Sequence, residues 1–151
     1  DRWNIIRTIL SFKPKGKATN LSLPLEYLLK IQKKKATAFL ISDFQDENYE
    51  SQLKLAKQRF DLIAINIIDP REESLPEVGM VYLEDSETGS TLLVDTSDRE
   101  MVKKHKSLCI KKRQDRETFF NSIGIDSIKI FTNRSLTDPI IKYFKYREKK
   151  H

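Results

Sequence analysis

The chain contains 151 residues, of which 38% are hydrophobic and 33% are charged, and its formal net charge is +6. This length is typical of one domain with its own core, and four glycines and five prolines leave little room for long disordered linkers. The apolar runs are too short to cross a bilayer, and no charged-then-apolar leader is present. We therefore expect a single cytoplasmic domain, residues 1–151, without membrane contact.

Charge is distributed unevenly along the chain. Residues 1–35 carry a net charge of +7, residues 36–100 carry −10, and residues 101–151 carry +9. Lysines surround the loop at residues 13–20 and crowd residues 103–113, a property that some nucleic-acid-binding proteins share. Few aromatic residues are interleaved with these bases and no known binding motif occurs, so we expect solvated lysines and no nucleic-acid partner.

The first two predicted elements are helices. Residues 2–12 place Trp3, Ile6, Ile9 and Leu10 at helical spacing, as in a helix that continues from upstream sequence. A lysine-rich loop follows, and residues 21–34 repeat the helical pattern. Pro24 is compatible with this second helix because it falls in the first turn.

The next segment, TAFLISDFQD at residues 37–46, predicts a strand that ends in a carboxylate. Its continuous apolar run is typical of a strand buried on both faces at the centre of a parallel sheet. Asp43 then lies at the carboxyl end of the strand, where ligands bind in open α/β sheets, and is a candidate for metal or polar-ligand contact. The alternative is that Asp43 caps the next helix or begins a turn.

Residues 49–60 predict a helix and residues 61–69 a second strand, so this region forms a βαβ unit with a parallel strand pair. Asp69 also ends its strand, but the neighbouring Pro70 favours a turn role. Residues 80–83 and 90–94 predict a β-hairpin whose turn, DSETGS, includes Gly89.

The last elements are a long helix, a third strand and a final helix. Ser97 and Glu100 have capping-box spacing for a helix to about residue 122, and Gly124 is a natural stop. Cys109, the one cysteine, lies in an apolar triplet on this helix and is expected to be a small core residue, with a reactive thiol as the alternative. Residues 125–132 predict the third strand, and Asp138 opens the final helix.

This alternation predicts a three-layer α/β fold. Three parallel strands make a narrow sheet, however, and the strand that ends at Asp43 is too apolar for a comfortable edge. We therefore expect an incomplete sheet. We also expect the open edge either to pair with another copy of the chain or to be covered by the helix that begins near Trp3.

Long stretches of the sequence resemble a known bacterial family. They are GKATNLSLPLEYLLK, AFLISDFQDENY and DPREESLPEVG, followed by a hairpin that contains ETG and LLVDT. In these stretches the chain resembles the carboxyl-terminal half of the proteins grouped as domain-of-unknown-function family fifty-eight. The resemblance implies a von Willebrand factor A-like, Rossmann-like doubly wound sheet, truncated to its carboxyl-terminal half, with an inserted β-hairpin.

The resemblance also implies a metal-ion-dependent adhesion site. Thr19, in GKATNL, matches the loop threonine of such a site, and Asp43, in LISDF, matches its later aspartate. The first motif, D-x-S-x-S, is absent before Thr19, and the family places it on an upstream strand. Hydroxyl and carboxylate oxygens suit Mg²⁺ or Mn²⁺. We expect such a cation in an intact domain and no tight site in these 151 residues.

Other candidate metal ligands have simpler explanations. Asp46, Glu47 and Glu50 follow Asp43 closely, but acidic residues before a helix ordinarily complement its dipole. His105 and His151 have no Cys or His nearby in ligand spacing, so we do not expect a zinc site. No nucleophile pattern and no glycine-rich phosphate loop occurs.

Three functions fit these observations. The first is a non-catalytic protein-interaction module; the resemblance implies that its partner is a MoxR-type AAA ATPase, for which it acts as an adaptor in protein remodelling or maturation. The second is a metal-dependent hydrolase or nuclease that uses Asp43, Asp46 and Glu47, and this function requires a converging carboxylate cluster. The third is a metal-free structural interaction domain, in which Asp43 only caps or turns the chain.

Overall fold

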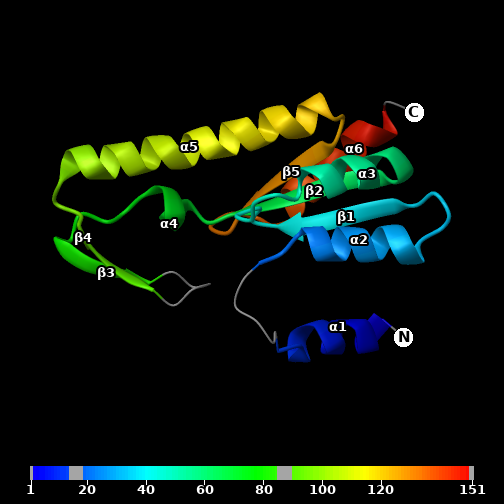
Figure 1. The fold of residues 1–151 in the computed structure, drawn as a ribbon, viewed down its shortest axis with the longest axis horizontal. Helices are drawn as coiled ribbons and strands as arrows, with labels where there is room; N and C mark the ends of the chain where they lie inside the picture. Colours follow the sequence, from blue (N-terminus) through cyan, green and yellow to red (C-terminus); the bar gives the residue numbers. More distant parts are fainter. Residues whose placement is uncertain (1, 14–18, 85–89, 150–151) are drawn as a thin grey trace.

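The computed structural model describes residues 2–13, 19–84 and 90–149 (Figure 1). The helices are α1 (Arg2–Ser11), α2 (Ser22–Ile31), α3 (Glu50–Arg59), α4 (Pro70–Glu73), α5 (Arg99–Ser122) and α6 (Thr137–Glu148). The strands are β1 (Thr37–Ser42), β2 (Asp61–Ile68), β3 (Met80–Glu84), β4 (Thr91–Asp95) and β5 (Asp126–Phe131). Within the described ranges, no helix is both long enough and apolar enough to span a membrane.

Three strands form a parallel sheet in the order β1-β2-β5. In its register, Ala64 of β2 lies opposite Leu40 of β1 and Ser127 of β5. The central strand β2 is buried along almost its whole length, which explains its nearly continuous apolar sequence. The parallel pairing of β1 and β2 through α3 confirms the predicted βαβ unit and the α/β class.

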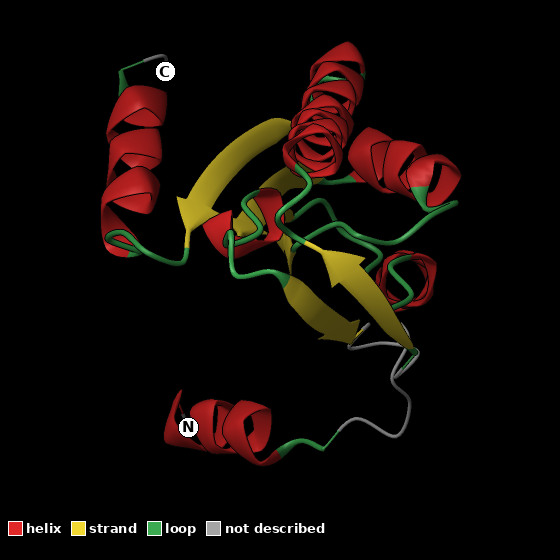
Figure 2. Cartoon of the chain, turned by 90° about the vertical axis from the view of Figure 1, so that its left-hand side faces the viewer, coloured by secondary structure: helices red, strands yellow, loops and turns green. Residues whose placement is uncertain are grey.

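Helices cover both faces of this sheet (Figure 2). On one face, α2, α3 and α5 contribute Leu25, Leu53 and Phe120 to the larger core cluster. On the other face, α6 packs Ile140 and Tyr143 against isoleucines of β2 and β5. Helices α3 and α5 lie on the same face of the sheet. The connections β1-α3-β2 and β2-α5-β5 advance in the same direction across the sheet, and crossovers between parallel strands are right-handed. The predicted three-layer arrangement is therefore present.

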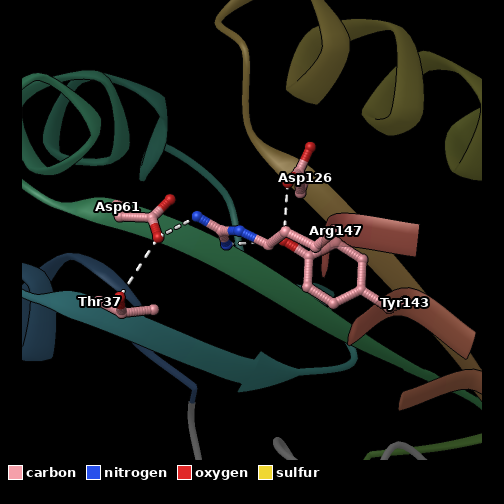
Figure 3. A network of polar contacts seen from close by, with 5 residues as sticks. All are labelled: Thr37, Asp61, Asp126, Tyr143 and Arg147. Atoms are coloured by element: carbon pink, nitrogen blue, oxygen red, sulfur yellow. Dashed lines mark hydrogen bonds and ion pairs between the residues drawn. The ribbon is translucent and has the colours of Figure 1, made fainter. Parts of the chain in front are cut away.

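A polar network attaches α6 to the amino ends of all three parallel strands (Figure 3). Arg147 forms an ion pair with Asp61 and donates a hydrogen bond to the Tyr143 hydroxyl (3.0 Å). Tyr143 in turn donates to a carboxylate oxygen of Asp126 (2.7 Å), and the Thr37 hydroxyl donates to Asp61 (3.2 Å). Burial, followed by the hydrogen bond to Asp126, raises the pKa of Tyr143 to about 12.

The prediction that β1 is buried on both faces is wrong. Its residues alternate between exposed and half-buried, and Ile41 is 64% exposed. The cause is its position at the edge of the sheet, where a neighbouring strand is present on one side only. The expectation that the helix near Trp3 covers this strand is also not met, because no residue of α1 is buried.

The long helix α5 begins one residue later than a capping box at Ser97 requires. Asp98 is the residue that caps it, since one carboxylate oxygen accepts hydrogen bonds from the backbone N–H groups of Glu100 (3.0 Å) and Met101 (3.1 Å). At the other end, Gly124 adopts a φ of +70°, which confirms it as the stop. Phe120 is the one residue of α5 that is fully buried.

The predicted hairpin is present as a separate two-stranded antiparallel sheet, β3-β4. Leu83 lies opposite Leu92, and Met80 lies opposite Asp95. The predicted turn with Gly89 falls at residues 85–89, outside the described residues.

Candidate functional site

The candidate site lies at the carboxyl edge of the parallel sheet. Strand β1 ends at Ser42 and β2 ends at Ile68, so Asp43 and Asp69 leave neighbouring strands at the same edge. Asp43 is exposed, and its Oδ1 atom accepts hydrogen bonds from the backbone N–H of Gln45 (3.2 Å) and from the Ser42 hydroxyl (3.4 Å). These bonds fix the carboxylate in the turn that follows β1.

The backbone of this turn has an unusual conformation. Phe44 has a φ of +56°, although its side chain is bulky, and the ring is almost completely buried. The Ser42 hydroxyl accepts a hydrogen bond from the Phe44 N–H (3.0 Å), and the Phe44 ring packs edge-on against Phe120. A positive φ at such a residue is sparsely populated and persists only where the surroundings enforce it, most often at functional sites.

Arg116 of α5 stabilises the turn by hydrogen bonds to its backbone. Its Nη1 atom donates to the carbonyl oxygens of Asp43 (2.6 Å) and Phe44 (2.7 Å), and its guanidinium lies 5.9 Å from the centre of the Phe44 ring. Both of these hydrogen bonds go to backbone carbonyls of the turn. The role of Arg116 is to fix the backbone from which Asp43 projects.

Glu72, in the short helix α4, completes an acidic group that we call the acidic edge: Asp43, Asp69 and Glu72. The Gln45 side chain donates to a carboxylate oxygen of Glu72 (2.7 Å). Partial loss of solvent raises the pKa of the exposed Glu72, and the negative charges of Asp43 and Asp69 raise it further, whereas Arg116 and the Gln45 hydrogen bond lower it. Asp43 and Asp69 are thus close enough to Glu72 to affect its ionisation.

Asp69 has the turn role predicted from its neighbour Pro70. Its Oδ1 atom accepts a hydrogen bond from the Arg71 N–H (2.9 Å) and caps α4, with Pro70 at the first helical position. The sequence did not predict α4 as a helix, because a single turn of four residues gives no periodic signal.

Thr19 lies in a loop that the structure brings against the same edge. The Leu21 N–H donates to Asp46 Oδ2 (2.6 Å), and the Ser22 hydroxyl donates to the carbonyl of Asn48 (3.3 Å). These bonds join the loop that contains Thr19 to the loop that contains Asp43. Asp46 therefore has a structural role: one of its oxygens accepts the Leu21 N–H and joins the two loops, and the other accepts the Glu47 N–H (2.8 Å).

The donor set at this edge does not fit a complete site for Mg²⁺ or Mn²⁺. Thr19 and Asp43 offer one hydroxyl and one carboxylate, whereas such ions take about six oxygen ligands. In the described parts of the chain, no three His, Cys, Asp or Glu side chains are grouped so that they could hold a metal ion. A cation at this edge would need ligands beyond Thr19 and Asp43.

The contact between His105 and Cys109, near the site, was not predicted from the sequence. His105 and Cys109 are one helical turn apart on α5, and the cysteine sulfur lies 3.7 Å from His105 Nε2 and 3.7 Å from the carbonyl oxygen of Glu72. Cys109 is half-buried and not the core residue predicted. The i, i+4 spacing on a predicted helix was the signal for this pair. The position of Arg116 over Asp43 had no local signal, because the two residues are 73 positions apart.

Asn66 is a further polar feature of the carboxyl half of the sheet. It is almost fully buried in β2, level with Ser42 of β1 and Lys129 of β5. Among the described residues, neither atom of its side-chain amide has a hydrogen-bond partner. An unpaired buried amide costs stability, and functional regions are where such costs are commonly retained.

Comparison with known proteins identifies the family. The family model described as "Protein of unknown function DUF58" matches residues 2–115. The chain belongs to this family. Membership confirms the resemblance seen in the sequence, and the matched segment contains Thr19, Asp43, Asp69 and Glu72. Arg116, β5 and α6 lie beyond the matched segment of this DUF58 protein.

Mycobacterial proteins are similar to this DUF58 chain. Uncharacterized protein MAV169 of Mycobacterium avium is 28% identical over 152 residues, which cover 99% of this chain and 89% of that protein. Uncharacterized proteins Mb1516 of Mycobacterium bovis and Rv1480 of Mycobacterium tuberculosis are each 33% identical over 88 residues, which cover 56% of this chain and 28% of each relative. The chain thus matches less than a third of the length of the latter two. No solved structure gives a significant match.

Proposed function

We propose that this DUF58 chain is a non-catalytic protein-interaction module, and that its acidic edge contacts the partner. The observation that carries the proposal is the fixed position of Asp43, an exposed carboxylate on a turn that Arg116 holds by two carbonyl hydrogen bonds. A group that is held in place before binding loses little conformational entropy when the partner arrives.

Charge supports the same reading. Asp43 and Glu72 are exposed, Asp69 is half-buried, and the three lie close enough for their charges to raise the pKa of Glu72. A cluster of this kind complements a basic surface on a protein partner and excludes acidic ones, which contributes specificity and rate of association. The site thus suits recognition of a basic patch.

The family resemblance extends the proposal to a partner and a fold. It implies a von Willebrand factor A-like domain and a MoxR-type AAA ATPase, with the DUF58 protein as an adaptor in protein remodelling or maturation. A role for Mg²⁺ or Mn²⁺ at Thr19 and Asp43 stays a prediction that needs ligands beyond these two residues. A cytoplasmic location also stays a prediction.

The hydrolase or nuclease alternative receives less support from the geometry. It requires Asp43, Asp46 and Glu47 to converge, but both carboxylate oxygens of Asp46 already accept backbone N–H groups, at 2.6 Å and 2.8 Å. A metal-free structural interaction domain stays the other alternative, and it predicts that partner binding survives the loss of the Asp43 carboxylate.

Site-specific photocrosslinking tests where a partner binds. A benzophenone amino acid is placed either at Gln45, which contacts Glu72 of the acidic edge, or at Lys145, an exposed position on α6 at the other face of the sheet. Each protein is irradiated with a purified MoxR-type AAA ATPase. We expect a covalent adduct from position 45 and little from position 145. Equal adducts from both positions, or an adduct from 145 alone, would refute the acidic edge as the contact.

A further inference from the structure

A second candidate site lies at the opposite end of the parallel sheet. A cavity of about 520 Å³ opens where β1 and β2 begin and α3 ends. Its lining is Lys35, Ala36, Thr37, Lys57, Gln58, Arg59, Phe60 and Asp61. We call it the basic cavity, because three of these residues are cations. Its volume is within the range of about 300–1,000 Å³ that is typical of small-molecule sites.

Arg59 is held in place by two hydrogen bonds, and Lys57 is half-buried. Arg59 donates from Nη1 to the carbonyl of Leu29 (2.9 Å) and from Nη2 to that of Lys33 (3.3 Å). Both acceptors are neutral, so these bonds orient the guanidinium and leave its charge uncompensated. Lys57 is half-buried, and its Cε atom lies 3.9 Å from the position that a Cβ would take at Gly124. Its stem therefore runs along the backbone of the α5–β5 turn.

The one carboxylate in the lining does not neutralise these cations. Asp61 is already paired with Arg147 of α6, and the same oxygen accepts the Thr37 hydroxyl (Figure 3). The pKa of Arg147 is raised, chiefly by its hydrogen bond to Asp61, so the guanidinium keeps its positive charge beside Asp61. The charge of Asp61 is thus balanced from outside the cavity, and Lys35, Lys57 and Arg59 remain in excess.

The carboxyl terminus of α3 also opposes the positive charge of the basic cavity. The carboxyl terminus of a helix carries about half a negative charge, and α3 ends at Arg59. Three full positive charges outweigh it. Lys33 and Lys34, which are exposed just before Lys35, add to the positive potential at the mouth of the cavity.

We propose that the basic cavity binds a phosphate-bearing anion, with Lys57, Arg59 and Lys35 as its cationic contacts. Phosphate offers several strong acceptor oxygens, which match a guanidinium and two ammonium groups that lie around one space. Phe60, which is buried, and Ala36, which is half-buried, line the same space with apolar groups, which suits a ligand with a small organic part beside its phosphate. Free phosphate and a phosphate ester share this chemistry, and the test below separates them.

The test is a titration of the full chain with inorganic phosphate and, in a second arm, with O-phosphoserine, followed by backbone amide chemical shifts. We expect saturable shifts at Ala36, Thr37 and Asp61, and weaker binding at higher salt, because exposed charge interactions are screened. Tighter binding of O-phosphoserine than of phosphate would assign the cavity to an ester, and equal binding would assign it to the free anion. Unphosphorylated serine should give no shifts.

Two variants and a matched control test whether phosphate binds at the basic cavity and not at exposed lysines in general. Lys57→Gln and Lys35→Gln should each weaken phosphate binding about tenfold, since each removes one charge-assisted contact. Lys103→Gln, which neutralises an exposed lysine on α5, should leave binding unchanged. The same loss in all three variants, or shifts spread over all lysine-rich segments, would overturn the proposal. Arg59 is left intact, because its bonds to Leu29 and Lys33 make it part of the fold.

Discussion

Arg116 holds Asp43 by its backbone: the guanidinium Nη1 atom lies 2.6 Å from the Asp43 carbonyl oxygen, although the residues are 73 positions apart in the chain. The Asp43 carboxylate is exposed, and its Oδ1 atom accepts hydrogen bonds from Ser42 and Gln45, which belong to the same turn. The contact from Arg116 thus fixes the backbone of the turn that carries Asp43. The candidate site therefore depends on α5 as well as on β1, the strand before the turn.

Replacement of Arg116 should destabilise the domain. Arg116→Ala leaves the carbonyls of Asp43 and Phe44 without their donor and removes the cation from the Phe44 ring. We expect a loss of about 2 kcal/mol in the free energy of unfolding, the scale of hydrogen bonds made by a charged group. Urea denaturation measures it. Lys112→Ala, an exposed change on the same helix, should cost little. Equal stability of the two variants would contradict the role of Arg116.

Substitutions at two neighbours of Glu72, Asp43 and Gln45, should shift the pKa of Glu72 in opposite directions. Asp43→Asn removes a negative charge that raises this pKa, so it should fall toward its ordinary value of 4.5. Gln45→Ala removes a hydrogen bond that lowers it, so it should rise further. NMR titration of the Glu72 side-chain carboxyl measures both. Shifts of the same sign, or none from Asp43→Asn, would mean that the two carboxylates do not interact.

The network around α6 predicts a loss of stability at high pH. The pKa of Tyr143 is raised from 10.0 to about 12, mainly by burial and then by its hydrogen bond to Asp126. Because the folded-state value is the higher one, this contribution to stability is fully present below pH 10.0 and is lost as the pH rises through about 12.

Tyr143→Phe should isolate that contribution. The variant loses the hydrogen bond to Asp126 and should be less stable at neutral pH by about 1 kcal/mol. Between pH 10.0 and about 12, its unfolding free energy should fall less steeply than that of the wild type. Chemical denaturation across this range measures the slopes, with Tyr27→Phe, at an exposed tyrosine of α2, as the control. Parallel slopes for wild type and Tyr143→Phe would contradict the assignment.

The open edge of the sheet predicts self-association. Phe39 and Ile41 of β1 are 46% and 64% exposed, and an uncovered apolar edge strand is a template for pairing with another chain. Ile41→Lys should shift the chain toward monomer in sedimentation velocity, because a charge on the edge opposes pairing. Leu55→Lys, on the exposed side of α3, should not. A wild-type chain that is monomeric at all concentrations would exclude this prediction.

Local sequence patterns predicted the elements because periodicity and turn residues act within a few positions. The βαβ unit, the hairpin and the stop at Gly124 all followed from such signals. The exposure of β1 did not, since apolar content reports the strand's capacity for burial and not whether a neighbour is present. Asp98 replaced Ser97 as the cap because either residue can accept the N–H bonds, and spacing alone does not choose between them.

The candidate site was predictable only in part. Asp43 followed from its place after an apolar run, and Thr19 from the family resemblance. The contributions of Glu72 and Arg116 depend on packing between α4, α5 and the β1 turn, which are distant in the chain. The positive φ of Phe44 has no sequence signal at all, because a phenylalanine there gives no hint of a left-handed turn.

The affinity of the chain for a purified MoxR-type AAA ATPase tests the central claim most directly. Surface plasmon resonance would compare the wild type with Asp43→Ala and with Asp115→Ala, which removes an exposed carboxylate from α5. Our account predicts measurable binding by the wild type and by Asp115→Ala, and binding at least about tenfold weaker by Asp43→Ala, because a paired charge at an interface is lost. Equal affinity of Asp43→Ala and wild type would contradict it and would favour a structural role for this aspartate.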